Sequence, residues 1–177
     1  MGKVTAMLTR IAAALLVLLG LGVVATTVRA QAPSIVGGNG DWTVYQYQDG
    51  DTTVCYMASK PVEDKGDYTQ RGDIWTLVTH RSPGEKVAVV SIIAGYNYKE
   101  GSTVKVKIDN TAFSLFTQGD TAWANTAEDD GRLVEAMKKG NRMVVQGVSW
   151  RGTETTDTYS LSGFTRSYDD VRAACGL

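Results

Sequence analysis

Side chains that could perform catalysis are few in this sequence of 177 residues. His80 is the only histidine, so a Ser-His-Asp arrangement would have to be built around it. The nearest match to a Gly-x-Ser-x-Gly nucleophile elbow, Gly147–Arg151, lacks the second glycine. One histidine and two distant cysteines also disfavour a zinc site. The sequence therefore predicts no enzyme and no cofactor, with His80 as a structural residue at the end of a strand.

Pairs of aspartates raise the question of calcium binding. Asp49 and Asp51 are spaced like the first two ligands of an EF-hand loop, but the glutamate needed at the twelfth position is Lys60. An Asp-Gly pair between two β-type runs is a hairpin signal, which explains both aspartates without a metal. Because the sequence does not show which acids face each other, a carboxylate pair for glycoside hydrolysis remains open.

Two stretches have residue types used in recognition. Residues 71–73 spell Arg-Gly-Asp, a tripeptide that some host integrins bind, although three residues often match by chance. Tyr96 and Tyr98 lead out of an apolar run, and Tyr45 and Tyr47 share one face of an earlier run. Tyrosine is favoured at interfaces because it joins an apolar ring to a hydroxyl. We take Tyr96 and Tyr98 as candidate partner contacts, with ordinary strand-end packing as the alternative.

The N-terminus has the order of a secretory signal. Lys3 and Arg10 give a basic start, residues 11–25 are an apolar run, and Val28 and Ala30 place small residues at the −3 and −1 positions. The run is shorter than the about 20 apolar residues that span a membrane. We therefore predict a cleaved export signal over residues 1–30, with no lipid or membrane anchor.

The remaining chain, residues 31–177, has 15 basic and 19 acidic residues, a net charge of −4. This mild acidity disfavours nucleic acid as a partner and electrostatic docking on anionic lipid. The length fits one domain. We predict a flexible, glycine-rich lead-in over residues 31–40 and a single soluble domain over residues 41–177. No pattern in the sequence indicates the oligomeric state.

Short β-type runs separated by turns dominate this domain. They lie at residues 42–48, 52–58, 74–80, 86–94, 104–108, 112–116, 142–150 and 156–163. Residues 59–72 are polar and predict a long surface loop, whereas residues 86–94 are apolar on both faces and predict a central, doubly covered strand. About eight strands at this spacing favour a mainly β fold, an antiparallel β-sandwich or flattened barrel.

Two short helices are expected among the strands. The first begins at Thr126 or Asp129 and ends at Gly140, with acids in its first turn and lysines in its last. The second is C-terminal and capped by Ser167. Its apolar residues recur at helical spacing on one face, which must point inward: Phe164, Tyr168, Val171 and Cys175.

Cys55 and Cys175 are the only cysteines, and neither has a C-x-x-C partner. In an oxidising compartment, an even pair is most simply a disulfide. Cys175 lies on the inward helix face, and Cys55 lies midway along the second run, where it is a plausible receiver. Two separate buried thiols are the alternative.

Several motifs occur in a recognisable order. They are GDWTV at residues 40–44, CYM at 55–57, VEAMKKG at 134–140, YSLSGF at 159–164 and Cys175-Gly176. From about Gly40 to Cys175, this order resembles the invasion-associated locus B (IalB) family of alphaproteobacterial exported proteins. The resemblance implies a β-sandwich in the periplasm or at the cell surface, and a link to bacterial entry into host cells. It implies no catalytic residues.

The chain departs from the family pattern at two places. Many members have a cysteine near the end of the first strand, where this chain has residues 45–47 (YQY), and a central cysteine pair, around where residues 119–125 (GDTAWAN) stand. The departure leaves Cys55 and Cys175 as the only bridge that can form.

Together these features predict an exported, non-enzymatic binding or interaction protein of the bacterial envelope, in the periplasm or at the cell surface. Its partner, a protein or envelope component, is not identified by the sequence. Contacts are expected on the 59–72 loop and the 96–102 turn, since loops on a rigid scaffold carry binding residues. The alternatives are a structural envelope-maintenance protein without a host partner, and a carboxylate-based glycan hydrolase.

Overall fold

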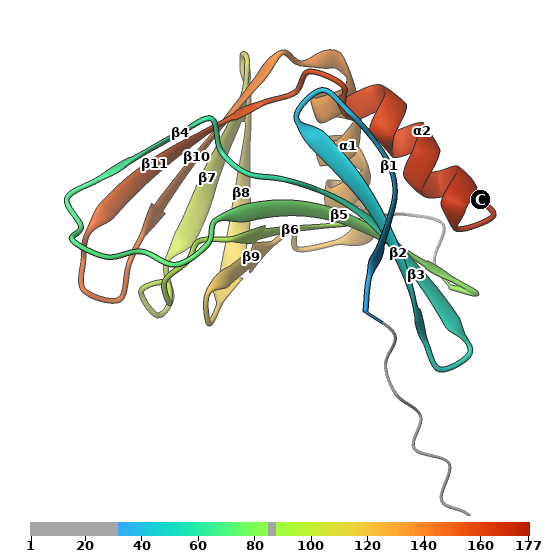
Figure 1. Cartoon of the computed structure of the whole chain (residues 1–177). Coiled ribbons are helices and arrows are strands. Elements are labelled where there is room, and N and C mark those ends of the chain that lie inside the picture. The colour runs from blue at the N-terminus through green and yellow to red at the C-terminus, as the bar shows by residue number, and fades with distance from the viewer. Residues whose placement is uncertain (1–31, 85–87) are drawn as a thin grey trace, which may run out of the picture.

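The computed structural model describes residues 32–84 and 88–177, so the predicted export signal over residues 1–30 lies outside the described residues. The described residues form eleven strands and two helices (Figure 1). The strands are β1 (Ser34–Asn39), β2 (Trp42–Asp49), β3 (Thr52–Ser59), β4 (Glu63–Gly66), β5 (Trp75–Ser82), β6 (Val89–Ile93), β7 (Thr103–Ile108), β8 (Thr111–Gln118), β9 (Thr121–Trp123), β10 (Arg142–Val148) and β11 (Glu154–Ser160). The helices are α1 (Ala127–Lys139) and α2 (Phe164–Ala174).

All the strands belong to one antiparallel sheet, in the order β1-β2-β3-β5-β6-β9-β8-β7-β10-β11-β4. The mainly β, antiparallel, sandwich-like prediction is confirmed, together with its two helices. The sheet is open between β1 and β4, so it is not a flattened barrel. Eight strands correspond to the eight predicted runs, and the described residues add three further strands, β1, β4 and β9.

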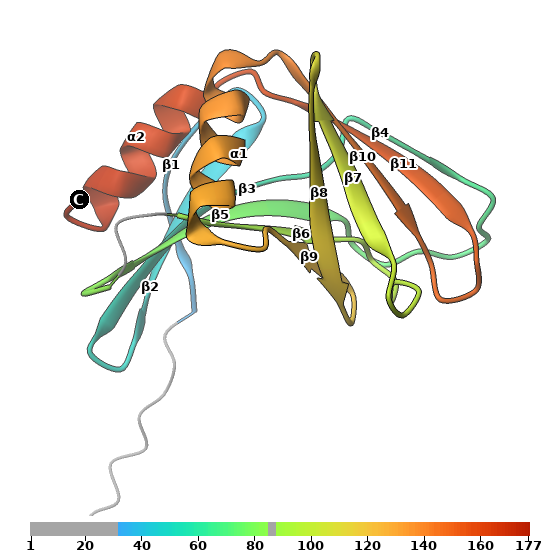
Figure 2. The same ribbon diagram turned by 180° about the vertical axis from the view of Figure 1, so that it is seen from behind.

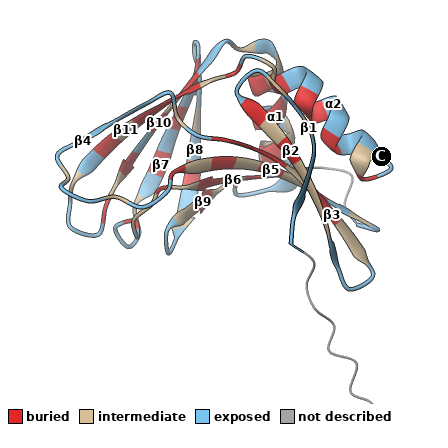
Figure 3. Cartoon of the chain, viewed as in Figure 1, coloured by how far each residue is buried: buried red, intermediate tan, exposed pale blue. Residues whose placement is uncertain are grey.

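One face of the sheet encloses the core. The sheet bends so that β7, β10 and β11 stand at a steep angle to β5 and β6 (Figure 1), and buried residues from both parts share one cluster (Figure 3). The alternation of side chains along β7 explains why only one face of the sheet lies in the core. Val104, Val106 and Ile108 are buried, while the intervening lysines are exposed. Helix α2 covers the same inner face of β1, β2, β3 and β5.

Helix α1 begins and ends where the sequence predicts. The Thr126 hydroxyl accepts a hydrogen bond from the Asp129 amide at 3.1 Å, which satisfies one of the free N–H groups of the first turn. The chain leaves the helix at Gly140.

Helix α2 begins before the predicted cap. Its N-cap is Gly163, with φ +84°, and Ser167 lies inside the helix, fully buried. The Ser167 hydroxyl instead accepts a hydrogen bond from the Asn39 amide at 3.1 Å, across the helix–sheet contact. The capping prediction for Ser167 was wrong because a tertiary partner uses the hydroxyl. The predicted inward face of the helix is buried.

The predicted flexible lead-in over residues 31–40 is also corrected. Residues 34–39 form β1, which pairs with β2 through a bulge between Ile35 and Gly37. The Asn39 side-chain amide donates to Asp170 on α2 at 2.8 Å. Local propensity favours a coil here, but pairing with a ready strand edge overrides it.

Two further expectations change in detail. The 59–72 segment is not only a loop, because it contains β4, which pairs with β11. Val89 is 43% exposed, so the predicted double cover of β6 fails at its start. No helix in the described part of the chain is long and apolar enough to cross a membrane.

Candidate functional site

The two cysteines form a disulfide. Cys55 on β3 and Cys175 at the end of α2 have Cα atoms 5.7 Å apart and are 120 residues apart in the chain. The bridge therefore fastens the C-terminal helix to the sheet, and the prediction of a disulfide is confirmed.

His80 lies beside this bridge, in the sheet position opposite Cys55. The residue is 1% exposed, and neither ring nitrogen has a hydrogen-bond partner among the described residues. Its ring centroid is 5.5 Å from that of Tyr168. Burial lowers the pKa of the His80 imidazole, and the positive charge of Arg172 lowers it further.

The lowered pKa of His80 predicts acid destabilisation. As the pH falls below about 6.5, His80 in the unfolded chain takes up a proton that the folded chain resists. The free energy of unfolding should therefore decrease with falling pH, by at most about 1.4 kcal/mol per pH unit from this group. Urea unfolding of the wild type and of His80→Leu between pH 5 and pH 8 measures this. The variant should show a shallower dependence on pH, and parallel curves would rule out His80 as the cause.

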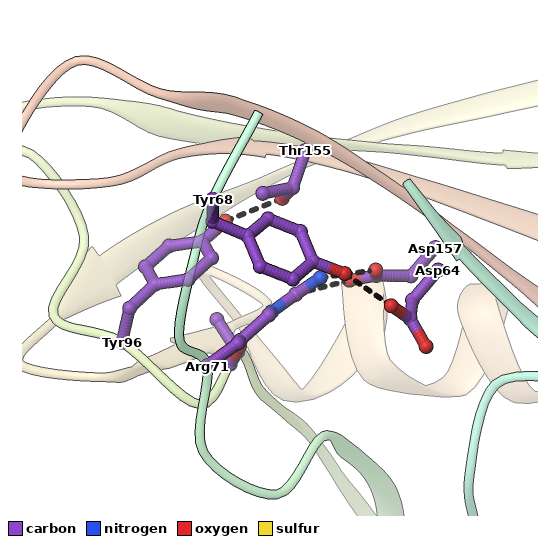
Figure 4. A network of polar contacts seen from close by, with 7 residues as sticks. Asp64, Tyr68, Arg71, Tyr96, Thr155 and Asp157 are labelled. Carbon is purple, nitrogen blue, oxygen red and sulfur yellow. Dashed lines mark hydrogen bonds and ion pairs between the residues drawn. The ribbon is translucent and has the colours of Figure 1, made fainter. Parts of the chain in front are cut away.

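The Arg-Gly-Asp tripeptide is not displayed as a unit, because the Arg71 side chain is buried. Its Nη1 and Nη2 atoms each donate to a carboxylate oxygen of Asp157 on β11 at 2.7 Å, and its Nε donates to the Ala94 carbonyl at 2.7 Å (Figure 4). Both side chains of the pair are 3% exposed. Desolvation raises the pKa of the Asp157 carboxyl, and the Arg71 charge opposes that shift.

Tyrosine rings enclose the Arg71 guanidinium. The ring centroids of Tyr68 and Tyr96 lie 5.4 and 4.9 Å from its Cζ atom. The Tyr68 hydroxyl contacts Asp64, and the Tyr96 hydroxyl lies 2.6 Å from the Thr155 Oγ1 atom (Figure 4). We call these six residues the Arg71 network: Asp64, Tyr68, Arg71, Tyr96, Thr155 and Asp157. The network ties the 59–72 segment to β11 and to the turn after β6.

Tyr96 and Tyr98, the two tyrosines predicted as partner contacts, lie largely inside the protein instead of on an exposed turn. Tyr96 is half-buried in the Arg71 network, and Tyr98 is only 7% exposed. Their rings meet edge to face, with centroids 5.3 Å apart. Burial raises the pKa of the Tyr98 phenol. Tyr98 therefore packs in the core, as the alternative of strand-end packing expects, and its ring is not exposed to a partner.

A different set of aromatic residues is open to solvent. We define the outer face as the sheet surface of β2 to β8 opposite to the helices. Its register aligns Tyr45, Tyr56, Thr79 and Val89 in one row, and Leu77, Ser91, Trp123 and Phe116 in the next. Each of these side chains is half-buried or exposed, so the row forms a continuous surface rather than a core.

Aromatic rings on neighbouring strands of the outer face contact one another. Tyr45 and Tyr56 stack with centroids 4.9 Å apart, and Tyr47 meets Tyr56 at 6.3 Å. Phe116 and Trp123 lie 5.8 Å apart on the neighbouring strands. Sequence reasoning identified only Tyr45 and Tyr47, because the other rings join them through strand register.

The outer face is hollowed beside these rings. A depression of about 560 Å³ is lined by Thr52, Thr79, Arg81, Pro83, Gly84, Val89, Ser91 and Trp123. Val89 and Trp123 supply apolar surface, while Arg81, which lies 3.6 Å from Asp49, adds a charge. Among the described residues, no group of three histidine, cysteine or carboxylate side chains is placed to hold a metal.

Comparisons with known proteins agree with this architecture. The model of the family described as "Invasion associated locus B (IalB) protein" matches residues 42–172. A crystal structure of invasion associated protein B from Bartonella henselae has a TM-score of 0.60 and 15% sequence identity. That match covers 81% of this chain and 100% of the other, and at this identity it concerns the fold alone. No curated protein sequence matches the chain. Because the family model spans most of the described residues, the chain belongs to the invasion associated locus B family.

Proposed function

We propose that this chain is an exported, non-enzymatic interaction protein of the bacterial envelope, which docks a partner protein through its outer face. The observation that carries the proposal is a helix-free sheet surface with half-exposed aromatic rings. Family membership and the disulfide support export, since disulfides persist in oxidising compartments. The periplasm is the proposed location, with the cell surface as the alternative.

The composition of the outer face suits protein recognition. Tyrosine and tryptophan dominate binding energy at interfaces because large, stiff rings bury much surface at low entropic cost. Val89 and Phe116 are 43% and 40% exposed, more than core residues of a sheet tolerate. Contiguous exposed apolar surface on a monomer commonly marks a binding site. The depression beside Trp123 offers a place for a partner's side chain.

Charge substitution on this face should abolish partner capture. Val89→Glu combined with Phe116→Glu places two carboxylates on the surface that a partner would cover, and desolvating them is costly. Cross-linking in living cells, followed by purification and mass spectrometry, should show at least a tenfold loss of the captured partner. The melting temperature should fall by less than about 5 °C, because surface changes cost little.

Val62→Glu is the matched control, because Val62 is 61% exposed and its amide pairs with Thr158 of β11, which is outside the strands of the outer face. Its capture should equal that of the wild type. Undiminished capture by the double variant would exclude the outer face. A captured resident envelope protein would indicate envelope maintenance, whereas a captured host protein would indicate a role in invasion.

A further inference from the structure

Strand β8 has an open edge in the middle of the sheet. It pairs with β7 from Thr111 to Phe116, but with β9 only from Phe116 to Gln118. Strand β9 ends at Trp123, where the chain turns away toward α1. Across residues 32–84 and 88–177, no strand therefore pairs with this side of β8 between Thr111 and Leu115.

The register of the hairpin shows which backbone groups are free. Residues 109–110 form a two-residue turn, so Ile108 and Thr111 are the first hydrogen-bonded pair of β7 and β8. Bonding alternates along an antiparallel pair. Ala112 and Ser114 therefore direct their N–H and C=O groups away from β7, on the side where Phe116 pairs with Trp123.

A groove follows this edge. It has a volume of about 580 Å³, within the range of ligand sites, and is lined by residues of β8 and α1. Figure 2 shows these two elements as neighbours. One wall is β8 from Thr111 to Leu115, and the other is a single face of α1. The lining residues of the helix and the segment before it are Ala124, Asn125, Asp129, Arg132, Glu135, Ala136 and Lys139. Phe113, Ala124 and Ala136 give the groove apolar surface.

Four charged side chains line the helix wall: Asp129, Arg132, Glu135 and Lys139. Asp129 pairs with Arg132, and Glu135 pairs with Lys138 at 2.9 Å. Lys139 is exposed and has no ion pair in the part of the chain that the structure describes. It stands at the end of α1 next to Gly140, where an added side chain would meet Ile108, so the Lys139 charge lies at the Thr111 end of the groove.

We propose that this groove binds an extended segment of another polypeptide as an added strand on β8. Main-chain hydrogen bonds to Ala112 and Ser114 would hold the segment, as in domains that recognise peptides by strand addition. The open edge of five residues spans about 17 Å, enough for five or six residues of ligand. Alternate side chains of the ligand would be apolar, to cover Phe113 and Ala136, with an acidic residue beside Lys139.

The groove favours an extended polypeptide over a compact small molecule. Ala112 and Ser114 each present a donor and an acceptor, spaced two residues apart along a strand, which matches the repeat of another strand's backbone. A sheet edge with such free groups is a template for pairing. The groove and the depression of the outer face share no lining residue, so the two proposals can be tested independently.

The test is selection of random nonapeptides displayed on phage against the purified protein. Ala136→Arg fills the groove and serves as the counter-selection target, while Ala173→Arg, on the exposed face of α2, is the matched control. Selected peptides should have apolar residues at every second position and an acidic residue at one end. They should bind the wild type and the control equally, and bind Ala136→Arg at least tenfold more weakly.

Amide hydrogen exchange then locates the bound peptide. Ala112 and Ser114 amides should exchange freely in the protein alone and slow at least tenfold when peptide binds. Ser114→Pro removes one groove-facing N–H without breaking the β7 ladder, and should abolish that binding. Lys139→Glu should weaken acidic peptides roughly two- to fivefold, and replacing the peptide acid by lysine should restore binding.

Three results would overturn the proposal. The first is that no peptide is enriched on the wild type relative to the Ala136→Arg protein. The second is that the Ala112 and Ser114 amides are already protected from exchange in the protein without peptide. The third is that Val89→Glu abolishes peptide binding, whereas Ser114→Pro does not. The second would mean that a segment of this chain or a second copy occupies the groove.

Discussion

Reduction of the Cys55–Cys175 disulfide should lower the free energy of unfolding by roughly 4–5 kcal/mol. The bridge closes a loop of 120 residues, and in the chain-entropy model a loop of that length restricts the unfolded chain by about this amount. Domains of this size have total stabilities of about 5–15 kcal/mol, so the bridge supplies a large share. Helix α2 should detach first, because the bridge is its covalent link to β3.

Urea unfolding of the wild-type protein with and without reductant measures this loss without changing the sequence. The Cys55→Ala/Cys175→Ala double variant should be as unstable as the reduced protein, and reductant should not affect it further. The reduced protein should also show faster amide exchange in α2 than in β7, which lies away from the bridge. A loss below about 1 kcal/mol would show that α2 is held by its apolar face alone.

The sequence could predict the elements whose pattern is local. Strand β7 follows from the alternation of valine and lysine, and α1 follows from a capping threonine, a terminal glycine and charges placed to suit the helix dipole. The disulfide was predictable because Cys55 and Cys175 are the only cysteines of a chain with a predicted export signal, and because Cys175 shares a helix face with Phe164 and Val171. For β7 and α1, neighbours within a few residues determine both the conformation and the buried face.

Elements that depend on distant partners could not be predicted. The glycine-rich β1 has no periodicity and exists because β2 offers it an edge. Ser167 looks like a helix cap, but its hydroxyl is used by Asn39, 128 residues away. Tyr98 looks like an exposed turn residue because the sequence does not show that the sheet folds over it.

The two candidate sites, the outer face and the groove beside β8, also depend on partners that are distant in the sequence. Tyr45, Tyr56 and Trp123 share the outer face only through the registers of successive strand pairs. The groove exists because β9 stops after three residues and leaves β8 unpaired, which is a consequence of chain geometry. Turn residues in the sequence indicate where strands begin and end, but they do not indicate that β9 is too short to cover the edge of β8.

Replacing Arg71 by methionine should destabilise the protein by about 3–5 kcal/mol. Removing one partner of a buried ion pair leaves the other charge uncompensated in a medium of low polarity. Asp157 would then lose both hydrogen bonds from the guanidinium while its side chain is only 3% exposed. The Tyr68 and Tyr96 rings would also lose the cation that they enclose. Urea unfolding at pH 7 measures the difference.

The double variant Arg71→Met/Asp157→Leu should recover most of that loss, because a buried pair replaced by apolar residues of similar volume is often neutral. Lys65→Met is the matched control: Lys65 forms an exposed pair with Glu63 at 2.7 Å, and its loss should cost less than about 1 kcal/mol. A double variant as unstable as Arg71→Met would show that the hydrogen bond to Ala94, not the paired charge, holds the 59–72 segment.

The pH dependence of Arg71→Met separates these explanations further. Without Arg71, desolvation and the negative charge of Asp64 act unopposed on Asp157, so the pKa of its carboxyl should rise above the already raised wild-type value. The folded variant then binds a proton that the unfolded chain has lost, and its stability should fall as the pH rises from the unfolded pKa, about 3.9, through the raised folded value. Relative to the wild type, Arg71→Met should therefore be least impaired in acid. If its deficit is the same at pH 5 and pH 8, the buried carboxylate is not its cause, and the lost packing of Tyr68 and Tyr96 is.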